Sequence, residues 1–516
     1  MRNRLVLRWL AKVTCPSLAL LMVGVGCATV DPKPDYNRTR TLIEQSTGVA
    51  ESYNPEEDGL TADELNAWLS NGLTLDEAVH IALLNNRKLQ AVFLDIGMAR
   101  ADWVQSGLLS NPSLGIGVMF PEGGGRSNIQ GNLAQNIVDL WQMPVKKRIA
   151  EHQVEGQVVR VARLAGELAA ETKRAYYAAV AANDLLTIAD ENLALLGKSH
   201  DAIRAQREAG VASPLDENLQ RGELLRAELD LRDARLDSVN AKRSLAGLLS
   251  LDLNTDELDL TDRLPESEEH AFDADSLIAI AREKRLDLKA LEEAVGAGDA
   301  EIKLEYLRVF PEFSIGIAAE RTEGRSQPGR DVAADFARAS LRSGELTIPD
   351  IQTRGERQAE KDQDIEFMIG PNLSVTLPFF DQNRAQIAKA TYAQVQAVKS
   401  YEDLYLGVAQ DIRMAVDQSK TLWGNVTFYR GELLPQADRN LEFTQAAYQA
   451  GTVGVLTLLE SQRSLLDTRR GYVQVWATAA TSLSDLERAV GLPLNDVEAA
   501  GTQEEGEQSN DEGGPS

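Results

Sequence analysis

Cysteine, histidine and aromatic residues are all scarce in this chain of 516 residues. Its two cysteines, Cys15 and Cys27, both lie near the N-terminus, so no disulfide is expected within the rest of the chain. Four scattered histidines form no ligand-spaced cluster with cysteine, which argues against a zinc site. Aromatic residues make up 5%, a low share for a compact core of this size. The formal net charge of −26 argues against a nucleic-acid partner.

Recognisable catalytic motifs are missing as well. The sequence contains no nucleophile elbow, no phosphate-binding loop and no metal-ligand motif. Pairs of Asp or Glu on long helices are usually solvated surface charge. We therefore expect a protein without enzymatic activity, cofactor or bound metal.

The N-terminus has the pattern of a secretory signal. A basic start precedes an apolar stretch, residues 17–25, which is too short to span a bilayer stably. The stretch ends at Cys27 in a sequence that resembles a bacterial lipobox, with Gly24 where Leu is usual. We expect a signal peptide over residues 1–26 and lipidation of Cys27; the alternative is ordinary cleavage near Ala28. No Asp follows the cysteine, which points to the outer membrane.

Two short segments far apart in the sequence are near-copies of each other. In each, an Ala-Gly pair is followed five residues later by Leu, with the glycines at Gly210 and Gly451. Glycine ends helices because it adopts a positive φ at little steric cost. Both segments are predicted to be tight helix-to-helix turns, and two such turns indicate a duplicated architecture.

The rest of the sequence divides into two similar halves, each predicted as helix, strand, strand, long helix, turn and helix. Strands are predicted where apolar residues alternate with small or polar ones. The predicted strands cover about 113–120 and 128–141 in the first half, and about 312–320 and 367–378 in the second. The predicted domains are a linker (27–72), a first repeat (73–253), a connector (254–272), a second repeat (273–495) and a disordered acidic tail (496–516).

Capping residues and prolines set the expected helix boundaries. One helix is predicted from 73 to about 109, and a long helix over 145–208 is expected to begin after Pro144. A second long helix is predicted over 382–449, with a coiled-coil seam and a kink at Pro435.

Three further segments complete the secondary-structure prediction. The linker is expected to be extended, with at most one short helix near 63–69. A single helix is predicted over about 273–302, and residues 321–364 are predicted to form an exposed loop. Trp141, at the expected end of the second strand, is predicted to lie at a membrane interface.

Two strand pairs per chain cannot close a barrel. Strands in a bilayer must be closed, because unpaired backbone groups are too costly there. If these strands cross a membrane, several chains must share one barrel, and the long helices must project away from it.

The ordered set of segments resembles the TolC family of bacterial outer-membrane efflux proteins. The resemblance implies a fold that is mainly α with a small transmembrane β part: a homotrimer with a twelve-stranded β-barrel that continues into a twelve-helix periplasmic α-barrel. It further implies an exit duct in the outer membrane of a Gram-negative bacterium, coupled through a periplasmic adaptor to an inner-membrane transporter. The segments that carry the resemblance are Leu73-Thr74-Leu75-Asp76-Glu77-Ala78, Asn111-Pro112-Ser113-Leu114, Leu377-Pro378-Phe379-Phe380-Asp381, Tyr448-Gln449-Ala450-Gly451 and Leu458-Leu459-Glu460-Ser461-Gln462-Arg463.

The resemblance also implies where a gate and an adaptor contact lie. In the family, the turns stand at the periplasmic tip, and acidic residues just past them line the constriction, where three copies of a carboxylate repel one another and attract cations. The alternative is that these residues are solvated helix-start groups favoured by the helix dipole. The matching gate candidates here are Asp216, Glu217, Thr457 and Glu460. The candidates for the turn tips and the adaptor contact are Arg207, Gly210, Val211, Tyr448, Gly451, Thr452 and Val453.

Two of these positions depart from the family pattern. Thr457 stands where an acidic residue is common, and Val453 stands where the family can place a basic one. A salt-bridge lock of the family's kind is therefore not expected at Val453.

Other functions stay open at this point. A secreted coiled-coil structural protein without a pore explains the helices but has no use for four alternating segments at repeat-matched positions. A periplasmic adaptor carries one hairpin and a lipoyl-like module, whereas this sequence carries two copies of a larger unit. A periplasmic enzyme needs a polar catalytic cluster that the sequence does not offer. The substrate is not readable from the sequence.

Overall fold

In the computed structural model of the chain, the described residues are 28–57, 60–120, 127–252, 258–265, 272–323, 332–347, 355 and 365–494. Cys27 and the acidic tail at 496–516 lie outside them. The chain forms two compact units. The strand unit draws on the described residues of Trp103–Ala150 and Ala297–Gln394, and the helical unit draws on those of Met1–Asp102, Glu151–Gly296 and Val395–Ser516.

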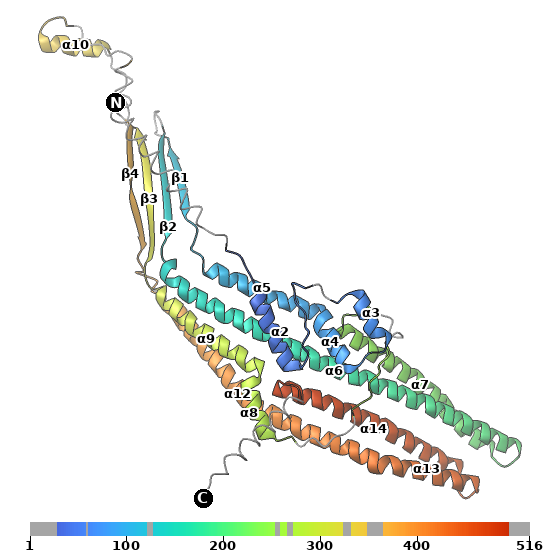
Figure 1. Ribbon diagram of the computed structural model, residues 1–516. Helices are drawn as coiled ribbons and strands as arrows, with labels where there is room; N and C mark the ends of the chain where they lie inside the picture. Colours follow the sequence, from blue (N-terminus) through green and yellow to red (C-terminus); the bar gives the residue numbers. More distant parts are fainter. Residues whose placement is uncertain are drawn as a thin grey trace, which may run out of the picture. The chain divides into compact units, whose positions relative to one another are not determined.

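The strand unit contains one antiparallel sheet with the strand order β1-β2-β3-β4 (Figure 1). Its register places Ile116 opposite Gly131, Gly131 opposite Ala319, and Ala319 opposite Ile369. Strands β1 and β4 are therefore the two edges of the sheet. The strands are β1 (Ser113–Met119), β2 (Asn128–Asn136), β3 (Glu312–Glu323) and β4 (Ile365–Thr376).

The two faces of this sheet differ in polarity. Directly opposed residues of antiparallel strands share a face, so the register assigns each side chain to one side. One face is apolar and exposed; it includes Leu114, Ile116, Val118, Ile129, Leu133, Ile315, Ile317, Phe367, Ile369 and Leu373. The other face is largely small or polar; it includes Gly117, Gln130, Asn132, Ser314, Glu320, Asn372 and Ser374.

The second strand is shorter than predicted. It ends at Asn136 instead of 141, because the Asn136 side chain accepts a hydrogen bond from the Val138 N–H (2.9 Å) and turns the chain into a helix that starts at Asp139. Pro144 lies inside that helix near its start. Trp141 is therefore a helical residue, and its ring packs edge-on against Phe313 at a centroid distance of 6.1 Å.

Helices make up most of the described chain (Figure 1). Four of them, α5, α6, α9 and α12, contribute residues to both units. The helices before the first turn are α2 (Lys33–Thr47), α3 (Ala62–Ser70), α4 (Leu75–Asn85), α5 (Arg87–Ser106) and α6 (Asp139–Glu208). Those after it are α7 (Pro214–Leu248), α8 (Ala274–Lys284), α9 (Leu286–Leu307), α10 (Val332–Ser343), α12 (Arg384–Phe428), α13 (Leu434–Gln449) and α14 (Val455–Val490).

Each of the two helices predicted to open a repeat is broken in two. Asn86 has an extended backbone (φ −64°, ψ 114°) between α4 and α5, where its Oδ1 accepts from the Leu89 N–H (3.0 Å) and its amide donates to the Leu248 carbonyl (2.7 Å). Arg285 is extended in the same way between α8 and α9 and pairs with Asp287 (2.7 Å). Apolar periodicity alone does not reveal such breaks, because the pattern continues through them.

The predicted kink at Pro435 coincides with a π-helical turn at Tyr429–Leu433, which separates α12 from α13. Within this turn the Leu434 N–H donates to the Tyr429 carbonyl, five residues back. Proline has no N–H and its ring clashes with the preceding turn, so the wider turn accommodates it.

Two segments predicted to be irregular contain helices. Helix α10 and an extension of β3 to Glu323 occupy part of the predicted loop at 321–364. The linker that was predicted to be extended contains the expected short helix, α3. It also contains α2, which was not predicted. Asp35 of α2 is 1% exposed and accepts two hydrogen bonds from Arg100 of α5 (2.6 and 2.7 Å).

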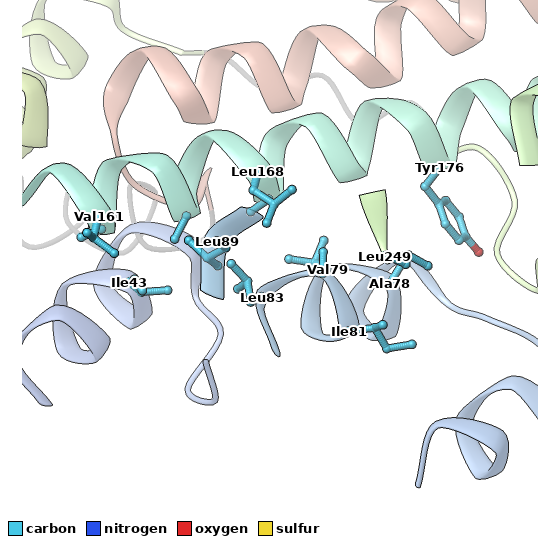
Figure 2. Packing of buried hydrophobic residues seen from close by; sticks show 14 of the residues in the cluster. Ile43, Ala78, Val79, Ile81, Leu83, Leu89, Val161, Leu168, Tyr176 and Leu249 are labelled. Atoms are coloured by element: carbon cyan, nitrogen blue, oxygen red, sulfur yellow. The ribbon is translucent and has the colours of Figure 1, made fainter. Parts of the chain in front are cut away.

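The main core of the helical unit gathers apolar side chains from α2, α4, α5, α6 and the C-terminal end of α7. Figure 2 shows Ile43, Leu83 and Leu89 beside α6, which contributes Val161 and Leu168. The N-terminal helix is therefore part of this core and not a free linker. Among the described residues, no helix combines the length and the hydrophobicity that a membrane crossing requires.

We predict that Asp35→Asn destabilises the helical unit by about 3 kcal/mol, the typical cost of breaking a buried ion pair. The substitution leaves the Arg100 guanidinium without this carboxylate. Glu44→Gln, which removes an exposed carboxylate from the same helix, is the matched control and should change little. Guanidinium unfolding followed by circular dichroism measures both, and equal midpoints for the two variants would contradict the prediction.

Candidate functional site

The two repeated turns, α6–α7 and α13–α14, have the same backbone geometry, which confirms that both are helix-to-helix turns. Gly210 and Gly451 adopt φ values of 76° and 73°. In the first turn, the N–H groups of Gly210 and Val211 donate to the carbonyls of Arg207 (2.9 Å) and Gln206 (2.8 Å). The equivalent bonds in the second turn run from Gly451 and Thr452 to Tyr448 (2.9 Å) and Ala447 (3.0 Å). This pattern satisfies the last carbonyls of each helix.

Two of the acidic gate candidates bond within the first hairpin. Asp216 forms a capping box with Ser213: its Oδ2 accepts from the Ser213 N–H (3.0 Å) and hydroxyl (2.8 Å). Glu217 forms an ion pair with Arg207 and so ties α7 to α6. Both carboxylates therefore have local roles at the start of α7.

The other two gate candidates lie on the first turns of α14, where the cap is weaker. Gly454 has no side chain to cap this helix, and the Thr457 N–H donates to the Gly454 carbonyl (3.2 Å). Thr457 and Glu460 are both exposed. The structure therefore does not bring them into the contacts that occupy Asp216 and Glu217.

The tips of the two hairpins pack against each other. Ile203 of α6 is buried with Val455 and Leu459 of α14. The Tyr448 hydroxyl on α13 donates to Gln206 Oε1 on α6 (3.1 Å). Burial raises the pKa of the Tyr448 phenol, and the Asp216 charge raises it further. Tyr448 is thus a direct link between the two turns.

The remaining tip candidates are less engaged. Val211 is 79% exposed, and Thr452 is exposed with its hydroxyl bonded to the Ala447 carbonyl of its own loop (2.9 Å). Val453 is half-buried. These residues offer apolar and small side chains at the outer end of each turn.

Sequence reasoning missed a pair of ionic contacts between α7 and α14. Arg463 Nε donates to Glu223 (3.0 Å), and Arg470 donates to Asp230 (3.0 Å). Both partners are seven residues apart on their own helix, so the contacts repeat after two helical turns. That shared spacing was the available signal, although the sequence alone does not show that the two helices are neighbours.

Two helix surfaces of this unit expose large apolar side chains. On α7 they are Leu215, Leu225, Leu229 and Leu236. On α12 and α13 they are Leu406, Met414, Phe428 and Phe443. We call these the α7 stripe and the α12–α13 stripe. Within the described chain, no group of three or more His, Cys, Asp or Glu residues is placed to hold a metal ion.

Comparisons of this chain with family models, known sequences and solved structures all find the same kind of protein. A family model described as "Outer membrane efflux protein" matches residues 78–250 and 277–492, which fall inside the two predicted repeats. The cobalt-zinc-cadmium resistance protein CzcC of Cupriavidus metallidurans is 21% identical over 81% of this chain and 90% of its own. Outer membrane protein OprJ of Pseudomonas aeruginosa is 24% identical over 92% and 95%. The CmeC outer membrane channel of Campylobacter jejuni shares the fold, with a TM-score of 0.64 and 17% identity over 86% and 90%.

We predict that Gly451→Ala loosens the second turn by about 1 kcal/mol, because a side chain disfavours the left-handed backbone that this turn requires. Hydrogen exchange of the amides around Thr452 should accelerate. Gly197→Ala, in the interior of α6 with no atom within 4 Å of the added Cβ, is the control and should leave exchange unchanged. If hydrogen exchange of these amides is unchanged in both variants, a side chain at Gly451 does not destabilise the turn, and the prediction is wrong.

A second prediction concerns pH. The hydrogen bond from Arg463 lowers the pKa of the Glu223 carboxyl below its ordinary value of 4.5. A depressed folded-state pKa stabilises the fold above the unfolded value, and that contribution is lost as the pH falls through the folded value. Thermal midpoints of the protein and of Glu223→Gln should therefore differ at pH 7 and converge as the pH falls below 4.5 and through the folded-state pKa. A difference that persists at low pH would contradict this assignment.

Proposed function

The chain belongs to the outer membrane efflux protein family, and from that premise we propose that three copies of it form one continuous exit duct. The chain is the outer-membrane component of an efflux system. In the proposed assembly the sheets form a twelve-stranded barrel in the outer membrane, and the long helices form a twelve-helix barrel in the periplasm. Substrates pass through it from an inner-membrane transporter and a periplasmic adaptor.

The observation that supports this proposal best is the difference between the two faces of the sheet, together with its two open edges. The sheet has an exposed apolar face, as a lipid-facing surface requires, and a polar face suited to a water-filled interior. Among the described residues, β1 and β4 each leave one side of the backbone without a strand partner. A bilayer tolerates no such open edge, so β1 of one copy is proposed to pair with β4 of the next.

The helical unit supports the same arrangement. The α7 stripe and the α12–α13 stripe are two different apolar surfaces of one chain. Contact between unlike surfaces generates a ring when the rotation closes. We propose that the α7 stripe of one copy packs on the α12–α13 stripe of its neighbour.

We further propose that the turn tips meet the adaptor and hold the gate. Val211 and Thr452 offer exposed side chains for the adaptor contact. Because Asp216 and Glu217 are occupied by Ser213 and Arg207, Glu460 is the carboxylate proposed to line the constriction in three copies. The Tyr448–Gln206 bond then takes the place of a lock at Val453.

Membrane attachment completes the proposal. Cys27 is proposed to carry the lipid that anchors each copy in the outer membrane. Only residues 28–32 separate it from the start of α2 in the sequence.

Single-channel recording in planar bilayers tests the duct. The purified protein should open a pore, and Glu460→Gln should weaken its preference for cations, because three carboxylates leave the mouth. Glu442→Gln, at an exposed position of α13, is the matched control. A well-folded trimer that opens no pore, with Glu460→Gln and Asp216→Asn also silent, would overturn the proposal.

The assembly predicts a separate outcome. Leu229→Asp places a charge in the α7 stripe and should shift the protein from trimer to monomer in native mass spectrometry, since an unpaired charge in an apolar contact is costly. Leu229→Met keeps the volume and polarity and should remain trimeric. If Leu229→Asp still forms trimers as stable as those of the parent protein, the contact between copies does not involve the α7 stripe.

A further inference from the structure

Four connections join the sheet to α5, α6, α9 and α12, and all four leave it at the same end. The start of β1, the end of β2, the start of β3 and the end of β4 lie together in the register. The β1–β2 and β3–β4 connections therefore leave the opposite end, and the second of them contains α10. In the proposed duct the long helices stand in the periplasm, so this opposite end, which we call the outer end, faces the outer leaflet.

Charged residues at the outer end of the sheet are placed on different faces. Arg321 of β3 lies on the apolar face, where the register sets it between Ile129 of β2 and Phe367 of β4. These two neighbours are 41% and 66% exposed. Glu320 and Glu366 belong to the polar face. A charge in a lipid-facing row is costly within the hydrocarbon and is tolerated where the side chain reaches the head groups.

Helix α10 is amphipathic. Ala337 and Leu341, four residues apart, form one exposed row on its surface, and Arg338 and Arg342 form an exposed row beside it. The Leu341 side chain is 83% exposed. An apolar row beside a basic row is the pattern of a helix that lies flat in a lipid–water interface, with its arginines reaching the head groups.

The end of α10 is fixed by hydrogen bonds of its own. Gly344 has a left-handed backbone (φ 71°), and its N–H donates to the Ser340 carbonyl (3.0 Å). The Thr347 N–H donates to Ser340 Oγ (3.1 Å), which folds the chain back on the helix. Leu346, in this folded-back segment, is 88% exposed. Helix α10 and the turn after it are therefore a formed structure whose apolar side chains are not covered by the described part of the chain.

From these placements we propose that the outer end of the strand unit binds a phosphorylated glycolipid of the outer leaflet, an inference that rests on the proposed duct. Helix α10 lies in the interface with Leu341 and Leu346 among the acyl chains. Arg342 and Arg338 on α10, and Arg321 on the lipid-facing side of β3, donate to the lipid phosphates. A guanidinium has five N–H donors, so Arg321 and Arg338 bind phosphate and keep the contacts that they make within the chain.

Titration of the full-length protein with lipid A, followed by native mass spectrometry, tests the phosphate contact. Arg342→Gln and Arg321→Gln should each weaken lipid A binding about fivefold, the contribution of one arginine at an anionic lipid surface. Monophosphoryl lipid A keeps the acyl chains but lacks one phosphate, and it should bind the parent protein more weakly.

Arg384→Gln is the matched control, because it removes an exposed arginine at the start of α12, where the sheet meets the helices. It should bind lipid A as the parent protein does. Equal affinity in the parent and both test variants, or equal binding of the two lipids, would overturn the proposal.

Spin labelling tests the placement of α10. A nitroxide attached at Leu341→Cys, with Cys15→Ser and Cys27→Ser, is measured in proteoliposomes that contain lipid A. Oxygen, which concentrates in lipid, should relax this label more than a water-soluble nickel complex does. The same label at Glu442→Cys, an exposed position of α13, should show the reverse. A label at Leu341 that is as accessible to nickel as the label at Glu442 would overturn the placement.

Single-channel conductance separates this inference from the duct itself. Arg342 and Leu341 face lipid in the proposal, so Arg342→Gln and Leu341→Asp should conduct as the parent protein does. Loss of lipid A binding with unchanged conductance supports the contact. A rise in conductance with Leu341→Asp would overturn it, because α10 would then cover the mouth of the pore. Absence of a pore from the parent protein would contradict the duct, whereas the lipid titration measures the contact by itself.

Discussion

The outer backbone edges of β1 and β4, which pair with no other strand in the described part of the chain, are the constraint on which the rest of the proposed structure depends. Four antiparallel strands with an exposed apolar face are unstable in water and cannot enter a bilayer with open edges. Both problems disappear when each edge meets the opposite edge of another copy. The exposed α7 and α12–α13 stripes impose the same requirement on the helices, because neither surface is covered by any described part of the chain.

In the proposed ring of three copies, the turn tips of the helical unit come together at one end. Within one copy, the tips are held by the buried Ile203–Val455 contact, the Tyr448–Gln206 bond and the ionic contacts of Arg463 and Arg470. If these tips form the proposed mouth, its opening requires α14 to move against α6 and α7. Asp216 caps its own helix, whereas Glu460 is exposed on the first turns of α14, which is why it is the carboxylate proposed to line the constriction.

The repeat and the ends of many helices could be predicted from the sequence. Prediction failed where a tertiary contact of a single side chain redirects the backbone. The two glycine turns and the four strands follow from local rules that the structure confirms. Asn86 and Arg285 interrupt helices through tertiary contacts that apolar periodicity does not contain. Helix α2 was missed because its Asp35 is buried by Arg100, far away in sequence. The bonds of Asp216 and Glu217 are local by contrast: Ser213 lies three residues before Asp216 in a capping box, and Arg207 lies just across the turn from Glu217.

Cross-linking of the two sheet edges tests the central claim most directly. Within one chain, β1 and β4 are separated by three strand spacings, about 14 Å, well beyond the reach of a disulfide. A cysteine at Val118 of β1, combined with cysteines scanned along β4, can therefore bridge only different copies. The account predicts covalently closed trimers from membranes treated with a mild oxidant, and no such product from either single cysteine. Failure to cross-link at every β4 position, in protein that is folded in the outer membrane, would contradict it.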